Sequence, residues 1–206
     1  MFLPSPSPFQ AHTPRVPSIA ALITVLFLTA VAPSVTADAG ARPEALTGEV
    51  SAATAPAAIF IVLHAEKETG DGVGRDPNLN DAGRERASSA LVELLDGAEI
   101  DAAYVTQWRR TQQTAAPLLE SIGRTPVMLE TDDGFEAALA ERLLANHRGE
   151  TVLVVGHSNT NPVLIEALGA APPSMTDDDY DDVYMVVFPA PGEARLIRLG
   201  YGRPTP

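Results

Sequence analysis

The chain has 206 residues, of which 45% are hydrophobic and 20% are charged, so its composition is that of a globular protein and excludes a wholly disordered chain. Its 27 Asp and Glu residues outnumber its 14 Lys and Arg residues, and the resulting net charge of -13 argues against a protein that binds nucleic acid. The sequence contains no cysteine, which excludes disulfides, thiolate metal ligands and cysteine nucleophiles.

The first 37 residues have the pattern of a secretory signal peptide. Arg15 precedes an apolar run over residues 18–32, which is shorter than the segment of about 20 residues that a spanning helix needs. Small residues follow, and cleavage is expected near Ala37 or Ala39. The sequence thus predicts an exported protein, periplasmic or secreted, with no membrane span after cleavage. The alternative is that the segment is kept as a membrane anchor.

Residues 38–57 are rich in Ala, Pro, Thr and Gly without periodicity, and we expect a flexible lead-in to one domain over residues 58–206. In that domain short apolar runs alternate with helical spacing. The expected elements are, in chain order, a strand over 58–63, a helix over 81–96, a strand over 102–105, a helix over 109–122, a strand over 127–129, a helix over 135–147, a strand over 151–155, a helix over 161–168, and strands over 183–188 and 194–199. This order predicts an α/β fold, a single three-layer α/β/α domain with a mostly parallel sheet.

Two histidines and an arginine pair are expected to meet at one edge of this sheet. His64 directly follows the first strand, and His157 follows the strand over 151–155 after a single glycine. Arg109 and Arg110 begin the helix that follows the second strand. Because ligands bind outside the carboxyl ends of the strands in open α/β sheets, these side chains predict a site. A helix N-terminus beside arginine favours a phosphate group there.

Five segments, in order along the chain, resemble the motifs of a known family. They are Val62–Lys67, Asp76–Ala87, Gln107–Ala115, Val152–Thr160 and Tyr180–Tyr184. The family is the histidine phosphatase superfamily, which is phosphoglycerate mutase-like, and the chain is similar to an exported branch resembling short phosphohistidine phosphatases. The resemblance covers about residues 58–200 and agrees with the fold expected above.

The resemblance implies an exported phosphohydrolase, a phosphomonoesterase that uses neither a metal nor an organic cofactor. It implies that His64 is the nucleophile and forms a phosphohistidine intermediate. Arg110 then corresponds to the phosphate-binding arginine, and His157 stabilises charge in the transition state. The expected partner is a small phosphorylated substrate, whereas neither the natural substrate nor the oligomeric state follows from the sequence.

Four further residues near the expected site are weaker candidates. Glu136 has the most suitable spacing among several acids for protonating the leaving oxygen. Arg109, Ser158 and Asn159 are candidate phosphate ligands; the alternatives are a solvated helix residue for Arg109 and helix caps for the other two. The acidic run over residues 177–182 lacks the spacing of a calcium loop and is interpreted as a solvated loop.

The main departure from the family pattern is Leu63, which stands where the family has a phosphate-binding arginine. Losing one preorganised donor of this kind costs about 10²- to 10³-fold in rate. Another arginine could substitute, and the candidates are Arg75, Arg84 and Arg109. Otherwise the chain is a weak phosphatase, or an inactive protein of the same fold that binds a phosphorylated ligand. Because both histidines and Arg110 are present, retained phosphatase chemistry is favoured, and Leu63→Arg is expected to raise turnover.

Overall fold

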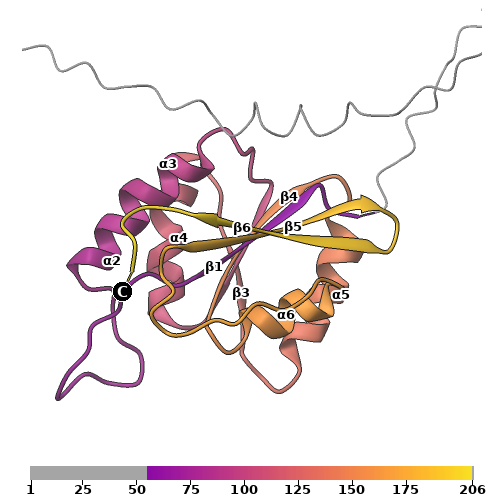
Figure 1. Ribbon diagram of the computed structural model, residues 1–206. Helices are drawn as coiled ribbons and strands as arrows, with labels where there is room; N and C mark the ends of the chain where they lie inside the picture. Colours follow the sequence, from indigo (N-terminus) through magenta and orange to yellow (C-terminus); the bar gives the residue numbers. More distant parts are fainter. Residues whose placement is uncertain (1–54, 206) are drawn as a thin grey trace, which may run out of the picture.

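A computed structural model describes residues 55–205, which form a six-stranded sheet with helices on both faces (Figure 1). The predicted signal peptide and most of the lead-in lie outside the described residues. The last residues of that lead-in are attached to the domain, since the Gly149 N–H donates to Ala55 O and the Ala57 N–H donates to Glu150 O, both at 2.8 Å.

The elements follow one another largely as strand and helix. They are β1 (Ala58–Leu63), α2 (Asp81–Glu85), η1 (Arg86–Ala90), α3 (Leu91–Leu95), β2 (Ala102–Thr106), α4 (Arg109–Ser121), β3 (Val127–Leu129), α5 (Phe135–Asn146), β4 (Thr151–Gly156), α6 (Asn161–Ala167), β5 (Asp182–Ala190) and β6 (Glu193–Gly200). Every strand and helix expected from the sequence is present, and the predicted α/β fold is confirmed.

The sheet has the strand order β3-β2-β4-β1-β5-β6. The pairs β2–β3, β2–β4 and β1–β4 are parallel, whereas β5 runs antiparallel to both β1 and β6. The two central strands, β1 and β4, are buried almost throughout, as expected for strands covered on both faces. The mostly parallel sheet therefore carries one antiparallel hairpin at its end.

Successive side chains of β1 enter two separate cores, one on each face of the sheet. Phe60 and Val62 pack with residues of α3 and α4, and Ile59 and Ile61 pack with residues of α5 and α6. Figure 1 shows the corresponding grouping, with α2, α3 and α4 on one face and α5 and α6 on the other. These two apolar layers hold the strand ends, and hence the site, in fixed positions.

The helix predicted over residues 81–96 contains one irregularity. Its middle turn, η1, is a π-helix between two α-helical segments. The Ser89 hydroxyl donates to the Glu85 carbonyl at 2.8 Å, a contact that competes with the regular helical hydrogen bonds. The spacing of apolar residues in the sequence does not reveal a single π-helical turn within a helix.

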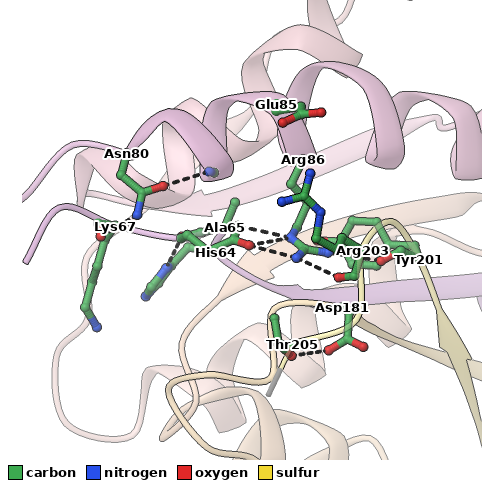
Figure 2. Close-up of polar contacts among 12 residues, drawn as sticks. His64, Ala65, Lys67, Asn80, Glu85, Arg86, Asp181, Tyr201, Arg203 and Thr205 are labelled. Atoms are coloured by element: carbon green, nitrogen blue, oxygen red, sulfur yellow. Dashed lines mark hydrogen bonds and ion pairs between the residues drawn. The ribbon is translucent and has the colours of Figure 1, made fainter.

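Arg86, at the start of η1, fixes the segment that follows His64 (Figure 2). Its side chain is 6% exposed and binds both carboxylate oxygens of Glu66, with an Nη2–Oε1 distance of 2.7 Å. It also donates to the carbonyl oxygens of Tyr201 and Arg203. One buried cation therefore joins the first loop, the helix and the C-terminal segment, and its charge is neutralised by Glu66.

No helix among residues 55–205 is both long enough and apolar enough to cross a membrane.

Candidate active site

The register of the sheet brings His64 and His157 together. Leu63 is paired with Gly156 in the parallel β1–β4 ladder, and each histidine directly follows one of these two residues. The His64 N–H donates to Gly156 O at 3.1 Å, and the centroids of the two imidazole rings are 5.5 Å apart. The sequence placed both histidines at the carboxyl edge of the sheet, and the structure brings them into contact.

His64 is a neutral imidazole, and its hydrogen bond defines which ring nitrogen is unprotonated. Nδ1 lies 2.9 Å from Ala65 O. A carbonyl oxygen only accepts, so Nδ1 carries the proton and Nε2 keeps its lone pair. Burial, followed by the charges of Arg110 and Lys67, lowers the pKa of His64 to about 4. The ring is therefore uncharged at neutral pH, and Nε2 has the electronic state that a nucleophile needs.

A chain of threonine hydroxyls fixes the other histidine. The Arg110 guanidinium donates to Nδ1 of His157 at 3.3 Å, so the proton of this ring is on Nε2. Nε2–H donates to Thr106 Oγ1 at 3.0 Å, and Thr106 donates onward to Thr111 Oγ1 at 2.9 Å. Thr111 in turn donates to the Trp108 carbonyl at 2.8 Å. Burial, followed by the charge of Arg110, lowers the pKa of His157 to about 3.

Gly156 allows the chain to make this approach. A Cβ atom at this position would lie 2.1 Å from Oδ1 of Asn161, whose side chain is buried and donates to Val62 O at 3.0 Å. The Thr160 hydroxyl accepts from the His157 N–H at 3.1 Å. The backbone around His157 is thus held from α6, and only glycine fits between the strand and the histidine.

Two donor nitrogens of Arg110 have no hydrogen-bond partner among the described residues. Arg110 lies in the first turn of α4, and its Cζ is 5.2 Å from the centre of the Trp108 ring. Its Nε and Nη1 atoms are buried, and neither has a hydrogen-bond partner among the described residues. Desolvation lowers the pKa of Arg110 below its usual value. Buried, unpartnered guanidinium donors are costly, and an anion bound beside them would satisfy them.

A groove runs from these residues towards the start of α5. Its volume is about 370 Å³, and its lining includes Arg110, His157, Asn159 and Glu136. The acid and the amide that the sequence singled out therefore face the same space as the arginine and the second histidine. Two more carboxylates, Asp132 and Asp133, also line this groove.

The remaining candidates make other contacts. The Arg109 side chain is 62% exposed and forms an ion pair with Asp76 at 3.4 Å, and its backbone N–H donates to the same carboxylate. The Ser158 hydroxyl donates to Asp177. Both residues are engaged in these contacts, and their assignment as phosphate ligands stays a prediction.

The interpretation of residues 177–182 as a solvated loop is wrong for several of its members. Asp177 accepts hydrogen bonds from Ser158 and from Lys67, whose Nζ is 3.3 Å away. Tyr180 is buried, with its ring centre 6.1 Å from that of His64. Asp182 is 4% exposed and binds Arg198 and the Tyr184 hydroxyl. An acidic run looks solvated in a sequence because its ion-pair partners are distant along the chain.

Leu63 is 1% exposed at the end of β1. Two of the arginines proposed to replace the missing charge are engaged elsewhere, because Arg84 binds Leu79 O and Asp81 while Arg109 binds Asp76. The third, Arg75, is exposed in the loop between β1 and α2.

The sequence analysis did not identify Thr106, Thr111, Lys67 or Asp177. Thr111 lies within the motif around Arg110, which was a usable signal, and Lys67 is the only lysine of the chain.

Among the described residues there is no group of three or more His, Asp or Glu side chains that could hold a metal ion.

Comparison with known proteins identifies one family model that matches part of the chain. Residues 59–137 match the family model of the histidine phosphatase superfamily, branch 1. No curated protein matches the chain.

Several solved structures share the fold. The protein histidine phosphatase SixA complexed with tungstate has a TM-score of 0.56 and 19% identity, covering 69% of this chain and 96% of that chain. For the alpha-ribazole phosphatase from Shigella flexneri the TM-score is 0.53 at 17% identity, with 69% and 96% covered. A phosphoserine phosphatase from Entamoeba histolytica, in complex with 3-phosphoglyceric acid, gives 0.53 at 14% identity, with 71% and 97% covered. The fold expected from the motifs is therefore confirmed, and residues 59–137 carry the resemblance to the family.

Proposed function

Because residues 59–137 match the histidine phosphatase superfamily and the described domain has its fold, we propose that the chain is a phosphomonoesterase whose nucleophile is His64. One observation carries the proposal. A buried neutral imidazole with a free Nε2 lies beside a second histidine and beside an arginine with two unpartnered donors. Such a set binds a phosphoryl group and attacks its phosphorus.

In the first step Nε2 of His64 attacks phosphorus and an N–P bond forms. The bond from phosphorus to the ester oxygen breaks, and that oxygen leaves with the electron pair. In the second step water attacks phosphorus, the N–P bond breaks, and its electron pair returns to Nε2. The water loses its proton to the carboxylate of Glu136, which restores the proton that Glu136 gave to the leaving oxygen. Inorganic phosphate is released and the enzyme is regenerated, so the cycle balances with water alone.

Arg110 supplies the charge stabilisation, and His157 positions it. The Nε and Nη1 atoms of Arg110 supply two donors for the equatorial phosphoryl oxygens. His157 is neutral and already accepts from Arg110, so it keeps the guanidinium in place and orients it towards the nucleophile. Both groups are preorganised by α4 and by the end of β4, which limits the reorganisation that the transition state requires.

Glu136 is the proposed proton donor for the leaving oxygen. It lies in the first turn of α5 and lines the same groove as Arg110 and His157. Glu136→Gln should slow the hydrolysis of alkyl phosphates more than that of aryl phosphates, because an aryl oxide leaves without protonation.

The proposal includes export and metal independence. Support for export comes from the signal-peptide pattern of the first 37 residues, and support for metal independence from a mechanism that uses only imidazole, guanidinium, carboxyl and water. Substrates would then be phosphate esters of the envelope or the medium. Cell fractionation with sequencing of the mature N-terminus tests the first part of this proposal.

The central test is the hydrolysis of para-nitrophenyl phosphate by the purified chain with EDTA present. EDTA-resistant turnover that is lost in His64→Ala, together with a phosphohistidine trapped by acid quench in the native chain, supports the proposal. Turnover that survives in a folded His64→Ala variant contradicts it.

A second candidate function is a catalytically weak or inactive protein that binds a phosphorylated ligand. Leu63 favours it, since a buried leucine cannot donate to phosphate. The two functions differ in how they respond to Leu63→Arg. If catalysis is limited by the missing donor, kcat/KM rises by about 10-fold or more, whereas a folded variant that gains no turnover shows that this donor is not limiting.

A further inference from the structure

We propose that Lys67 is the second cation of the phosphate site. In the absence of phosphate it forms an ion pair with the carboxylate of Asp177, and a bound phosphate group replaces that carboxylate. The proposal rests on the proposed phosphate site described above and assigns to it two residues for which the resemblance implies no role.

The site needs a second positive charge. A phosphate monoester carries up to two negative charges near neutral pH, and both histidines are neutral there. Arg110 supplies a single positive charge. Leu63 supplies none, so another cation has to lie within reach of the phosphoryl oxygens.

Lys67 lies in the right place. It follows His64 by three residues, and Figure 2 shows both side chains on the same side of this segment. Its side chain is 24% exposed, and it lines one surface depression together with Arg110. Lys67 and Arg110 are also the cations whose charges act on both histidines after the effect of burial.

The segment that carries Lys67 is fixed from two sides. The Lys67 carbonyl accepts from the Asn80 side chain at 3.2 Å, and Lys67 forms an isolated antiparallel bridge with Leu79. Arg86 holds the neighbouring Glu66. The backbone position of Lys67 is therefore fixed, and only its side chain is free to change conformation.

The carboxylate of Asp177 makes contacts like those expected of a bound phosphate group. It accepts from Lys67 Nζ through Oδ2 and from the Ser158 hydroxyl through Oδ1. It therefore bridges a residue beside His64 and a residue beside His157, as a phosphate group at this edge would. Its side chain is 64% exposed and belongs to the segment between α6 and β5, so water can replace the contact at small cost when phosphate enters.

The test measures binding of inorganic phosphate and of vanadate to the full chain by isothermal titration calorimetry. Lys67→Met removes the charge and keeps the length of the stem. Lys67→Arg is the conservative variant. Arg75→Met tests the competing cation, because Arg75 lines the same surface depression and is the remaining arginine that could replace the missing one. Circular dichroism confirms that each variant is folded.

We expect Lys67→Met to weaken phosphate binding by about 10- to 100-fold, the typical effect of one charge-assisted contact. Lys67→Arg and Arg75→Met should stay within a few-fold of the native chain. Asp177→Asn should tighten binding by about 2- to 5-fold, the contribution of a half-exposed ion pair. Unchanged affinity in Lys67→Met, or an equal loss in Arg75→Met, overturns the role of Lys67. Unchanged or weaker binding in Asp177→Asn overturns the role of Asp177.

These binding measurements separate the two proposals. A chain that binds phosphate through Lys67 but hydrolyses no ester contradicts only the proposed enzymatic function. A chain that hydrolyses esters through His64 while Lys67→Met binds phosphate normally contradicts only the role of Lys67.

Discussion

Burial determines the protonation state of both histidines. Their exposed fractions are 2% for His64 and 6% for His157, and burial is the largest cause of the lowered pKa in each case. At pH 5.5 an ordinary histidine, with a pKa of 6.5, is mostly protonated, whereas His64 with a pKa of about 4 stays neutral. We therefore expect His64, the proposed nucleophile, to stay unprotonated and active down to about pH 5. Imidazole ¹⁵N NMR between pH 4 and pH 8 measures this.

The unfolded chain in urea is the control, since its histidines should titrate near the ordinary value. Because the unfolded chain binds these protons at a higher pH than the folded chain, the free energy of unfolding should fall as the pH drops from about 6.5 towards 4. A titration midpoint near 6.5 for either buried histidine in the folded chain would contradict the assignment.

The hydroxyl of Thr106 accepts from the nitrogen of His157 that carries the proton, and so holds the ring in the tautomer that Arg110 selects. In Thr106→Val the buried Nε2–H loses its acceptor, and an unpaired buried donor costs about 1–3 kcal/mol. We expect kcat/KM to fall by about tenfold, with the loss mainly in kcat because Arg110 loses its oriented partner. Thr106→Ser keeps the hydroxyl and should recover most of the activity. Equal losses in the valine and serine variants would contradict a role for this hydrogen bond.

At the scale of the elements, α2 packs unusually close to the segment after β1. A Cβ atom at Gly83 would lie 2.1 Å from the Glu66 carbonyl oxygen. Alanine is favoured over glycine in a helix by about 1 kcal/mol, but a clash with backbone outweighs this preference. We expect Gly83→Ala to lower the free energy of unfolding by about 1–3 kcal/mol in urea denaturation.

Gly74→Ala is the matched control for this variant, because a Cβ atom at Gly74 meets no atom within 4 Å. It should leave the free energy of unfolding almost unchanged. If Gly83→Ala is as stable as the native chain, the helix has room to move away, and the close contact does not position the segment that carries Lys67.

The sequence predicted the elements well because their signals are local. The branched apolar run of β1 and the helical spacing of α4 each indicate burial directly. Contacts between distant segments have no such signal. The Arg86–Glu66 pair spans 20 residues and the Ser158–Asp177 contact spans 19.

The candidate site divides in the same way. His64, Arg110 and His157 follow strand ends, so topology alone predicts that they converge. Lys67 and Asp177 meet only because the loop after α6 returns across the carboxyl edge of the sheet, 110 residues along the chain. The sequence does not indicate where such a loop returns to the sheet, and its acidic composition suggests that the loop is exposed to solvent.

At the scale of the whole molecule, the proposed phosphate site lies in a strongly acidic protein. The net charge is -13, and Asp132 and Asp133 line the groove beside Arg110. At long range an anionic substrate is repelled, while at contact distance it meets Arg110 and, on our proposal, Lys67. Ionic strength separates these effects, because the screening length falls from about 30 Å at 0.01 M to about 8 Å at 0.15 M.

We therefore expect kcat/KM for para-nitrophenyl phosphate to rise by about 2- to 5-fold between 0.01 M and 0.15 M salt, as screening removes the long-range repulsion and leaves the short contacts. Most of the change should be in KM, since bound substrate is held at distances that salt screens little. A phosphate ester whose leaving group carries an ammonium group is the control, and its kcat/KM should rise less. A kcat/KM for para-nitrophenyl phosphate that falls steadily with salt would show that Arg110 and Lys67 already dominate the field at long range, and that the acidic surface has no effect on substrate entry.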